Sequence, residues 1–327
     1  MTRADTLGIV GAGSFGSALA SVIGRAGRRV VIWSRDHAVV EAINTKHRSP
    51  RMPAAMLPEC VVATADPREL ASDARFIVLA TTSSVVRERS LELGVVLDGS
   101  HIVVHAIGAL AHPGNERVSE VMTQGLPTLK VGVLAGPALP ADLAEGEFAS
   151  MVIASAFDEV VAEGRRLLNA PPGLRVYGSK DLAGVELASA LSGAYTIALG
   201  LADGLGMGPG PRAVLITRAV AESSRLGLAA GAEARTFAGL AGLGNMLVRA
   251  SGERSADYVL GRRIADGIVT GDNARTEGAR ATITGLELAK SLRVRMPVLQ
   301  GLAAVLTGKL EPRDAAQLVG DQVAVEE

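Results

Sequence analysis

Short runs of consecutive apolar residues alternate with segments of helical apolar spacing along the first half of the chain. The runs lie at residues 6–11, 29–34, 60–65, 76–81, 101–106, 130–136, 151–155 and 174–179. Unbroken apolar runs are typical of strands buried on both faces, and strands that alternate with helices form parallel sheets covered by helices. Residues 1–180 therefore predict an α/β Rossmann domain with a doubly wound parallel sheet.

The pattern changes near residue 180. Residues 181–327 consist of long segments rich in Ala and Leu with helical spacing, and they carry almost no strand signal. This half predicts an all-α domain, which follows a dinucleotide-binding domain. One apolar stretch in it, ASALSGAYTIALG at residues 188–200, is built mostly from small residues and predicts a helix that packs closely against its neighbours.

Composition narrows the function classes. The formal net charge is -1, which disfavours nucleic acid or an anionic membrane as a partner. A single cysteine, Cys60, excludes a disulfide framework, and five scattered histidines give no metal-ligand spacing, so no metal site is expected. The N-terminus has no signal-peptide pattern and no long uncharged apolar span is present, so we expect a cytoplasmic protein.

The sequence GAGSFG at residues 11–16 has the spacing GxGxxG between a predicted strand and a predicted helix. In a dinucleotide site Gly11 would make the tight turn, Gly13 would let backbone approach the pyrophosphate, and Gly16 would let the helix pack near the strand. The start of the helix would then offer N–H groups to the phosphates. The alternative is a purely structural strand-to-helix turn.

The end of the second predicted strand bears on the cofactor. It reads Ser34-Arg35-Asp36, with the arginine ahead of the acidic residue. An acidic residue at this point favours NAD, whereas an arginine can hold the 2′-phosphate of NADP. The order slightly favours NADP over NAD. The alternative is that Arg35 covers the adenine or faces solvent.

Several blocks together resemble the NAD(P)-dependent glycerol-3-phosphate dehydrogenases. They are GAGSFGSALA at 11–20, LAGPALPADLAEG at 134–146, ADGLGMG at 202–208, the stretch from LITRA to GLGN at 215–245, and EGARAT at 277–282. The resemblance implies a Rossmann domain followed by a helical domain of the 6-phosphogluconate-dehydrogenase-like type. It also implies hydride transfer between nicotinamide and dihydroxyacetone phosphate, which gives sn-glycerol 3-phosphate.

The resemblance also implies site residues, and many of them differ here. The family's two lysines fall at Ser192 and Ile107. The positions that match or replace substrate-binding residues of the family are Gly136, Asn245, Ser255 and Asp257. Three further positions carry a different residue from the family: Ala256 replaces a phosphate-binding arginine, Ala138 replaces a threonine and Asp142 replaces a glutamate. On the cofactor side Ser14, Phe15, Arg35 and Glu277 occupy matching positions.

Other groups are candidates for the missing catalytic lysine. Ser192 and Tyr195 are three residues apart on a predicted helix, so their hydroxyls could share a face and relay a proton. His105 ends a predicted strand, where ligands collect in this fold, and it titrates near neutral pH. The alternatives are a small packing serine, a core tyrosine and a structural histidine.

Three functions remain open from the sequence. The first is an NAD(P)-dependent oxidoreductase with an altered small-molecule substrate, because loss of a general acid costs on the order of 10²–10⁴ in rate. The second is an inactive NAD(P)-binding homologue that acts as a sensor or partner protein. The third is an ordinary glycerol-3-phosphate dehydrogenase with compensating residues. A homodimer is compatible with all three functions.

Overall fold

The chain divides into two compact units in the computed structural model, which describes residues 3–268 and 276–315. The N-terminal unit consists of residues 1–107 and 117–182. The C-terminal unit consists of residues 108–116 and 183–327, so a nine-residue segment from the first half of the chain belongs to the second unit. Each unit has its own cluster of buried apolar side chains.

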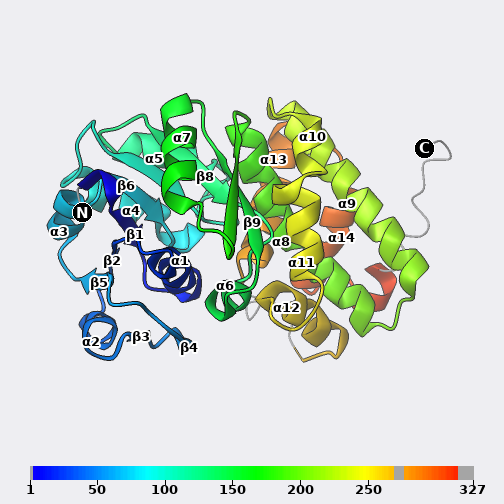
Figure 1. Ribbon diagram of the computed structural model, residues 1–327. Helices are drawn as coiled ribbons and strands as arrows, with labels where there is room; N and C mark the ends of the chain where they lie inside the picture. The colour runs from blue at the N-terminus through cyan, green and yellow to red at the C-terminus, as the bar shows by residue number, and fades with distance from the viewer. Residues whose placement is uncertain (1–2, 269–275, 316–327) are drawn as a thin grey trace. The chain divides into compact units, whose positions relative to one another are not determined.

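An eight-stranded sheet forms the centre of the N-terminal unit, in the order β10-β9-β8-β7-β6-β1-β2-β5 (Figure 1). Its strands are β1 (Leu7–Val10), β2 (Val30–Trp33), β5 (Val61–Thr64), β6 (Phe76–Leu79), β7 (Ile102–His105), β8 (Val131–Ala135), β9 (Ala149–Ala154) and β10 (Leu174–Ser179). Every neighbouring pair is parallel except β8 and β9. The order reverses between β1 and β6, which is the arrangement of a Rossmann sheet.

Each of the eight predicted runs overlaps one strand of this sheet, with β9 beginning two residues before its run, so the predicted fold class is confirmed. Two local features differ from a fully parallel sheet. The β8–β9 pair is antiparallel, and a small hairpin of β3 (Arg48–Ser49) and β4 (Met52–Met56) lies outside the main sheet. The hairpin segment contains two prolines, Pro50 and Pro53, which remove backbone donors and hide the strand signal in the sequence.

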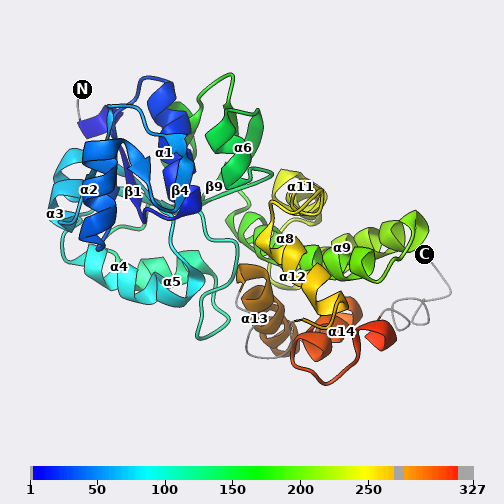
Figure 2. The ribbon, with the colours of Figure 1, turned by 90° about the horizontal axis from the view of Figure 1, so that it is seen from below.

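Helices cover both faces of the sheet. They are α1 (Ser14–Arg25), α2 (His37–Lys46), α3 (Pro67–Asp73), α4 (Val86–Gly94), α5 (Val118–Gly125), α6 (Pro140–Glu145) and α7 (Asp158–Leu168). Figure 2 shows α4 and α5 side by side on one face and α1 beside α6 on the other. This double cover explains why all four residues of β1, β2, β6 and β7 are buried.

The C-terminal unit is helical in the residues that the structure describes, in agreement with its pattern. Its helices are α8 (Leu182–Gly204), α9 (Pro209–Ala229), α10 (Ala234–Phe237), α11 (Asn245–Arg249), α12 (Ala256–Ala265), α13 (Glu277–Ser291) and α14 (Pro297–Leu306). A π-helical turn, Leu240–Gly244, leads directly into α11. Such turns are rare and are frequent at functional sites.

The long apolar helix α8 is the core of this unit. It is long and apolar enough to cross a membrane by length and composition, but 89% of its most apolar window is buried in the protein. A Cβ added at Gly200 would collide with the Tyr258 carbonyl oxygen of α12, and one at Gly261 of α12 would collide with the Ile197 carbonyl oxygen of α8. The small residues therefore let two helix backbones approach closely, as the sequence predicts.

Candidate functional site

The glycine loop after β1 is shaped by three different contacts. Gly11 has a φ of +107°, and a Cβ there would lie 2.6 Å from the Ala80 carbonyl oxygen. A Cβ at Gly16 would collide with the Gly11 carbonyl oxygen. At Gly13, by contrast, a Cβ would meet no atom within 4 Å among the described residues. The loop is thus tight at its first and third glycines and open at its second.

The start of α1 follows this open point. No side chain caps the helix, so its first N–H groups are left for water or a ligand. Ser14, the first helical residue, is exposed, and its hydroxyl donates to the Arg51 carbonyl oxygen of the β3–β4 hairpin at 3.2 Å. Phe15 is half-buried against the apolar core. An open backbone cradle beside an uncapped helix start fits a dinucleotide pyrophosphate.

The three residues after β2 have separate roles in the structure. Asp36 caps α2 by accepting hydrogen bonds from the Ala38 and Val39 N–H groups, and the Ser34 hydroxyl oxygen accepts from the Asp36 N–H. Arg35 forms an ion pair with Glu88 at 3.1 Å, and both side chains are about 60% exposed. Because exposed pairs are worth little, this contact leaves Arg35 available to an anionic ligand.

His105 is the last residue of β7 and is buried, as is Ile107 two residues later. The Ile107 N–H donates to the His105 Nδ1 atom at 3.3 Å. An imidazole nitrogen that accepts a hydrogen bond carries no proton, so in this geometry the proton of a neutral ring lies on Nε2. His105 therefore lies at the strand end where the sequence predicts it, with its tautomer fixed by the backbone.

The structure brings Ser192 of α8 and Asn245 of α11 together in the C-terminal unit. The Ser192 hydroxyl donates to the Ser189 carbonyl oxygen at 2.7 Å and accepts from the Asn245 side-chain amide at 2.8 Å. Both side chains are buried and uncharged. The single proton of the serine hydroxyl is thus held by the backbone of its own helix.

The structure places Tyr195 away from this pair of side chains. Its hydroxyl donates to Glu222 of α9 at 2.9 Å, and the same carboxylate accepts from the Val298 and Leu299 N–H groups at the start of α14. Burial, followed by the nearby Glu222 charge, raises the pKa of Tyr195 well above its usual value. The Ser192 and Tyr195 hydroxyls bond to different helices, so a shared relay is not assembled, and Tyr195 holds α9 and α14 in place.

Asp257 of α12 is also buried and has two partners. One oxygen accepts from the Gly278 N–H at the start of α13 at 3.0 Å, and the other accepts from the Arg249 guanidinium of α11. Arg249 is a residue that sequence reasoning missed. The available signal was its spacing, four residues after Asn245, which places both on one face of a helix.

The remaining predicted residues have local structural partners. Ser255 caps α12 by accepting from the Tyr258 N–H at 3.5 Å. Glu277 begins α13 and pairs with Arg280. Gly136 follows β8 with a φ of +147°, and a Cβ there would lie 2.8 Å from the Ser150 carbonyl oxygen. Within residues 3–268 and 276–315, no three His, Cys, Asp or Glu side chains are grouped as metal ligands.

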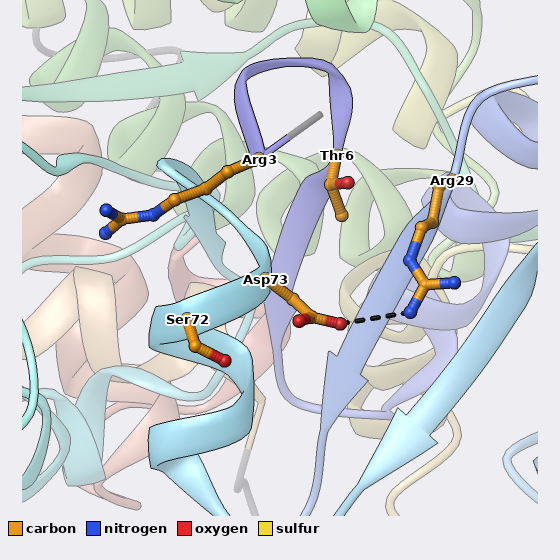
Figure 3. Close-up of a pocket in the computed structure, with 5 residues that line it drawn as sticks. All are labelled: Arg3, Thr6, Arg29, Ser72 and Asp73. Atoms are coloured by element: carbon orange, nitrogen blue, oxygen red, sulfur yellow. Dashed lines mark hydrogen bonds and ion pairs between the residues drawn. The ribbon is translucent and has the colours of Figure 1, made fainter. Parts of the chain in front are cut away.

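A separate cavity of about 340 Å³ lies in the N-terminal unit, lined by Arg3, Thr6, Arg29, Ser72 and Asp73 (Figure 3). Thr6 and Arg29 immediately precede β1 and β2, so the cavity is at the opposite strand ends from the glycine loop. Two cations line the cavity, and one of them, Arg29, is neutralised by its ion pair with Asp73 at 3.0 Å. This cavity is therefore a separate feature from the dinucleotide cradle.

Comparison with protein-family models gives two matches along the chain. Residues 6–161 match the NAD-dependent glycerol-3-phosphate dehydrogenase N-terminus, and residues 181–317 match the C-terminus of the same family. A glycerol-3-phosphate dehydrogenase [NAD(P)+] of Thermobifida fusca is 34% identical over 316 residues, which are 94% of this chain and 94% of the relative. The enzyme of that name from Pseudomonas aeruginosa strain PAO1 is 33% identical over 325 residues, 98% of this chain and 94% of the relative.

Solved structures give the same match. The glycerol-3-phosphate dehydrogenase of Coxiella burnetii superposes with a TM-score of 0.90 at 27% identity, covering 97% of this chain and 99% of that one. The Plasmodium falciparum glycerol-3-phosphate dehydrogenase shares the fold at a TM-score of 0.85 and 16% identity, covering 98% of this chain and 96% of that one.

Proposed function

The chain belongs to the NAD-dependent glycerol-3-phosphate dehydrogenase family, and on that premise we propose that it oxidises or reduces a small unphosphorylated alcohol or ketone. The observation that carries the proposal is the environment of Ser192. The resemblance implies a lysine at this position, whereas Ser192 is bonded to a backbone carbonyl and to the neutral amide of Asn245. A hydroxyl held in this way supplies neither a cation nor a ready proton to a substrate oxygen.

The second support is the phosphate side of the site. The resemblance implies an arginine and an asparagine where this chain has Ala256 and Asp257. Alanine offers no side-chain hydrogen bond, and the Asp257 carboxylate is already paired with Arg249 and the Gly278 N–H. A phosphate dianion would lose its charge-assisted donors and would meet a buried negative charge.

The cofactor in this proposal is NADP, with NAD as the less favoured alternative. Gly11, Gly13 and Gly16 with Ser14 and Phe15 would hold the pyrophosphate and the nearby ribose. Arg35, released from its exposed pair with Glu88, would meet the 2′-phosphate, and Ser34 would lie beside it. Bound NAD(P)H supplies the hydride. We expect Glu277, the matching residue of the C-terminal half, to contact the cofactor as well.

The proton for the substrate oxygen has to come from this chain or from water. We assign hydrogen bonding of that oxygen to Asn245, whose amide has a second N–H besides the one donated to Ser192. The resemblance also implies Gly136 and Ser255 as substrate-binding residues, and we propose them in that role. We propose His105 as the proton donor. Donation requires the imidazolium form, in which Nδ1 also carries a proton and no longer accepts from the Ile107 N–H, so that Nε2 can give up its proton and leave a neutral ring. A cytoplasmic location and a homodimer stay predictions.

A second candidate function is an NAD(P)-binding protein without turnover that acts as a sensor. The observation that favours it is that both hydroxyls proposed for chemistry, Ser192 and Tyr195, are buried and already hydrogen-bonded. The two candidates agree on cofactor binding. They differ in whether NAD(P)H is consumed when a ketone is added.

The test is NADPH and NADH oxidation by the purified chain with two matched ketones, dihydroxyacetone and dihydroxyacetone phosphate. We expect the phosphorylated compound to be turned over no faster than the unphosphorylated one. Turnover of dihydroxyacetone phosphate at ordinary dehydrogenase rates, about 10 s⁻¹ or faster, would contradict the proposal and favour an ordinary family enzyme with compensating residues. Tight NADPH binding without consumption across a panel of ketones would favour the sensor.

A further inference from the structure

Arg249 is the cation beside the Ser192–Asn245 pair in the C-terminal unit. It ends α11, one helical turn after Asn245. A Cβ added at Gly108 would lie 3.6 Å from the Arg249 Nη1 atom, and one at Gly193 would lie 3.4 Å from Nη2. The guanidinium therefore lies between two positions that have no side chain, next to the residue that follows Ser192.

The hydrogen bonds of this guanidinium are incomplete. Its Nη2 atom donates to Asp257, but Nε is buried and has no partner among the described residues. The side chain is only 20% exposed, whereas that of Asp257 is 2% exposed. A buried charged group with an unfilled donor costs free energy unless a ligand or an ordered water completes it. The Arg249 guanidinium can therefore donate a further hydrogen bond to an acceptor on a ligand.

We propose that Arg249 binds the carboxylate of the substrate, so that the substrate is a small hydroxy or oxo monocarboxylic acid. The inference rests on the proposed oxidoreductase function and names the substrate class for it. Guanidinium is the side chain best suited to a carboxylate, because its planar N–H groups match the two carboxylate oxygens. The neutral Ser192–Asn245 pair beside it then meets the reacting oxygen.

The charge balance favours a carboxylate over a phosphate. Arg249 contributes one positive charge and Asp257 one negative charge, and the next described cation on α13, Arg280, is paired with Glu277. A carboxylate brings a single negative charge and needs one fork of donors. A phosphate near pH 7 brings up to two charges, and the second cation it would need, for which Arg280 is the candidate on α13, is already engaged by Glu277.

Asp257 acts in this proposal as a positioning residue. The Gly278 N–H fixes one of its oxygens, and the other holds the Arg249 Nη2 atom. A Cβ at Gly193 would lie 3.2 Å from the same Asp257 oxygen, so a larger residue at 193 would crowd the ion pair. The orientation of the guanidinium is therefore set by residues on three other helices rather than by its own flexible stem.

The experiment compares matched ketones on the full chain saturated with NADPH. Pyruvate and hydroxyacetone differ only in a carboxylate against a hydroxymethyl group, and acetoacetate and 4-hydroxy-2-butanone differ in the same way. We expect kcat/KM, or affinity where turnover is slow, to be about tenfold to a hundredfold higher for the carboxylate of at least one pair. Equal values within both pairs, or no binding of any of the four, would overturn the assignment of Arg249.

Variants separate this inference from the function on which it rests. Arg249→Lys keeps the charge and should raise KM about tenfold for the carboxylate only. Arg249→Met with Asp257→Asn removes both charges together, which avoids a lone buried carboxylate, and should abolish the carboxylate preference. Arg235→Met removes an exposed arginine of the same unit that pairs with Glu233 and serves as the control.

The NADPH dissociation constant should be unchanged in all three. A carboxylate preference that survives in the double variant would overturn the role of Arg249. Failure of the wild-type chain to bind NADPH would instead overturn the proposed oxidoreductase function.

Discussion

The glycine loop of the N-terminal unit and the Ser192–Asp257 region of the C-terminal unit are built from different materials. The loop is made of backbone: two glycines in close contact, one glycine facing open space, and the uncapped start of α1. The second region depends on side chains of three helices, α8, α11 and α12, which form the pairs Ser192–Asn245 and Arg249–Asp257, and on one backbone N–H at the start of α13.

This difference implies that the cofactor-binding region and the substrate-binding region of such a protein tolerate amino-acid substitution to different degrees. A backbone cradle keeps its function as long as its glycines remain, because its donors belong to no particular side chain. Proton transfer and phosphate binding depend on individual titrating groups, and a single substitution removes them. We therefore expect cofactor binding and triose phosphate turnover to be separable properties in this chain.

The largest expected effect is on the cofactor cradle. Gly13 has an ordinary φ and open space around its Cα, so Gly13→Asp should fold normally while it places a carboxylate against the pyrophosphate. Two like charges about 4 Å apart repel by about 4 kcal/mol at an effective dielectric of 20. Titration calorimetry should show NADPH affinity reduced more than about a hundredfold.

The control is Gly210→Asp, which adds the same charge at another glycine with open surroundings in the C-terminal unit. It should leave NADPH binding unchanged. If Gly13→Asp binds NADPH as well as this control does, the cradle does not hold the pyrophosphate.

The next effect concerns the side-chain region. Asp257→Ala leaves Arg249 without its carboxylate and the Gly278 N–H without an acceptor, so it should lower the free energy of unfolding by about 3 kcal/mol. Denaturant unfolding of the wild type, of Asp257→Ala and of Asp257→Asn, which keeps one acceptor, would measure this loss of stability. Equal stability of all three proteins would show that the ion pair is incidental.

A smaller effect should separate the two cofactors. Arg35→Ala removes a cation that is otherwise held only by an exposed pair with Glu88. It should weaken NADPH about tenfold and NADH much less, because only NADPH carries the 2′-phosphate. Glu88→Gln removes the ion-pair partner of Arg35 but keeps the arginine, so it should change NADPH affinity in the opposite direction. Equal losses for both cofactors in Arg35→Ala would mean that the arginine only covers the adenine.

The smallest effect is a pH dependence from Glu222. Burial raises the pKa of this carboxyl, against the opposing hydrogen bonds from Val298 and Tyr195. A raised folded-state pKa gives stability that is fully present below the unfolded pKa and is lost as pH rises through the folded value, by about 1.4 kcal/mol per unit of difference.

The stability of the wild type relative to Glu222→Gln should therefore decline as pH rises above about 4.5. Thermal melts across the acidic range would measure it, with the exposed Glu41→Gln as the matched control. A constant difference between wild type and Glu222→Gln would show that the carboxyl has an ordinary pKa.

The sequence predicts the fold well because its signals are local. Most main-sheet strands are unbroken apolar runs, although β10 carries Arg175 and β9 carries Ser150, and the glycine spacing lies within six residues. The β3–β4 hairpin has no such run, because Pro50 and Pro53 interrupt it. The antiparallel direction of β8 and β9 has no counterpart in the apolar pattern, because the same kind of run occurs in parallel and antiparallel strands.

The candidate site was only partly predictable for a related reason. The position of Arg249 depends on helices that begin far from it in the sequence, 67 residues before it at Leu182 and 28 residues after it at Glu277, and α11 itself has only five residues. Tyr195 is on a helix that is buried on nearly all sides, so helical periodicity does not reveal which face carries function. Pairing of Ser192 with Asn245, in contrast, follows once α8 and α11 are packed together.

The assignment of residues 108–116 to the C-terminal unit has a consequence for building chimaeras. Ala109 of this segment packs with Ala190 and Ala281, so the segment is shaped to its own α8 and α13. A hybrid that joins residues 1–182 to the helical half of a relative would carry these nine residues into a foreign neighbourhood. A module that can be exchanged consists of two separate stretches of the chain, residues 108–116 and 183–327, and both have to be transferred together.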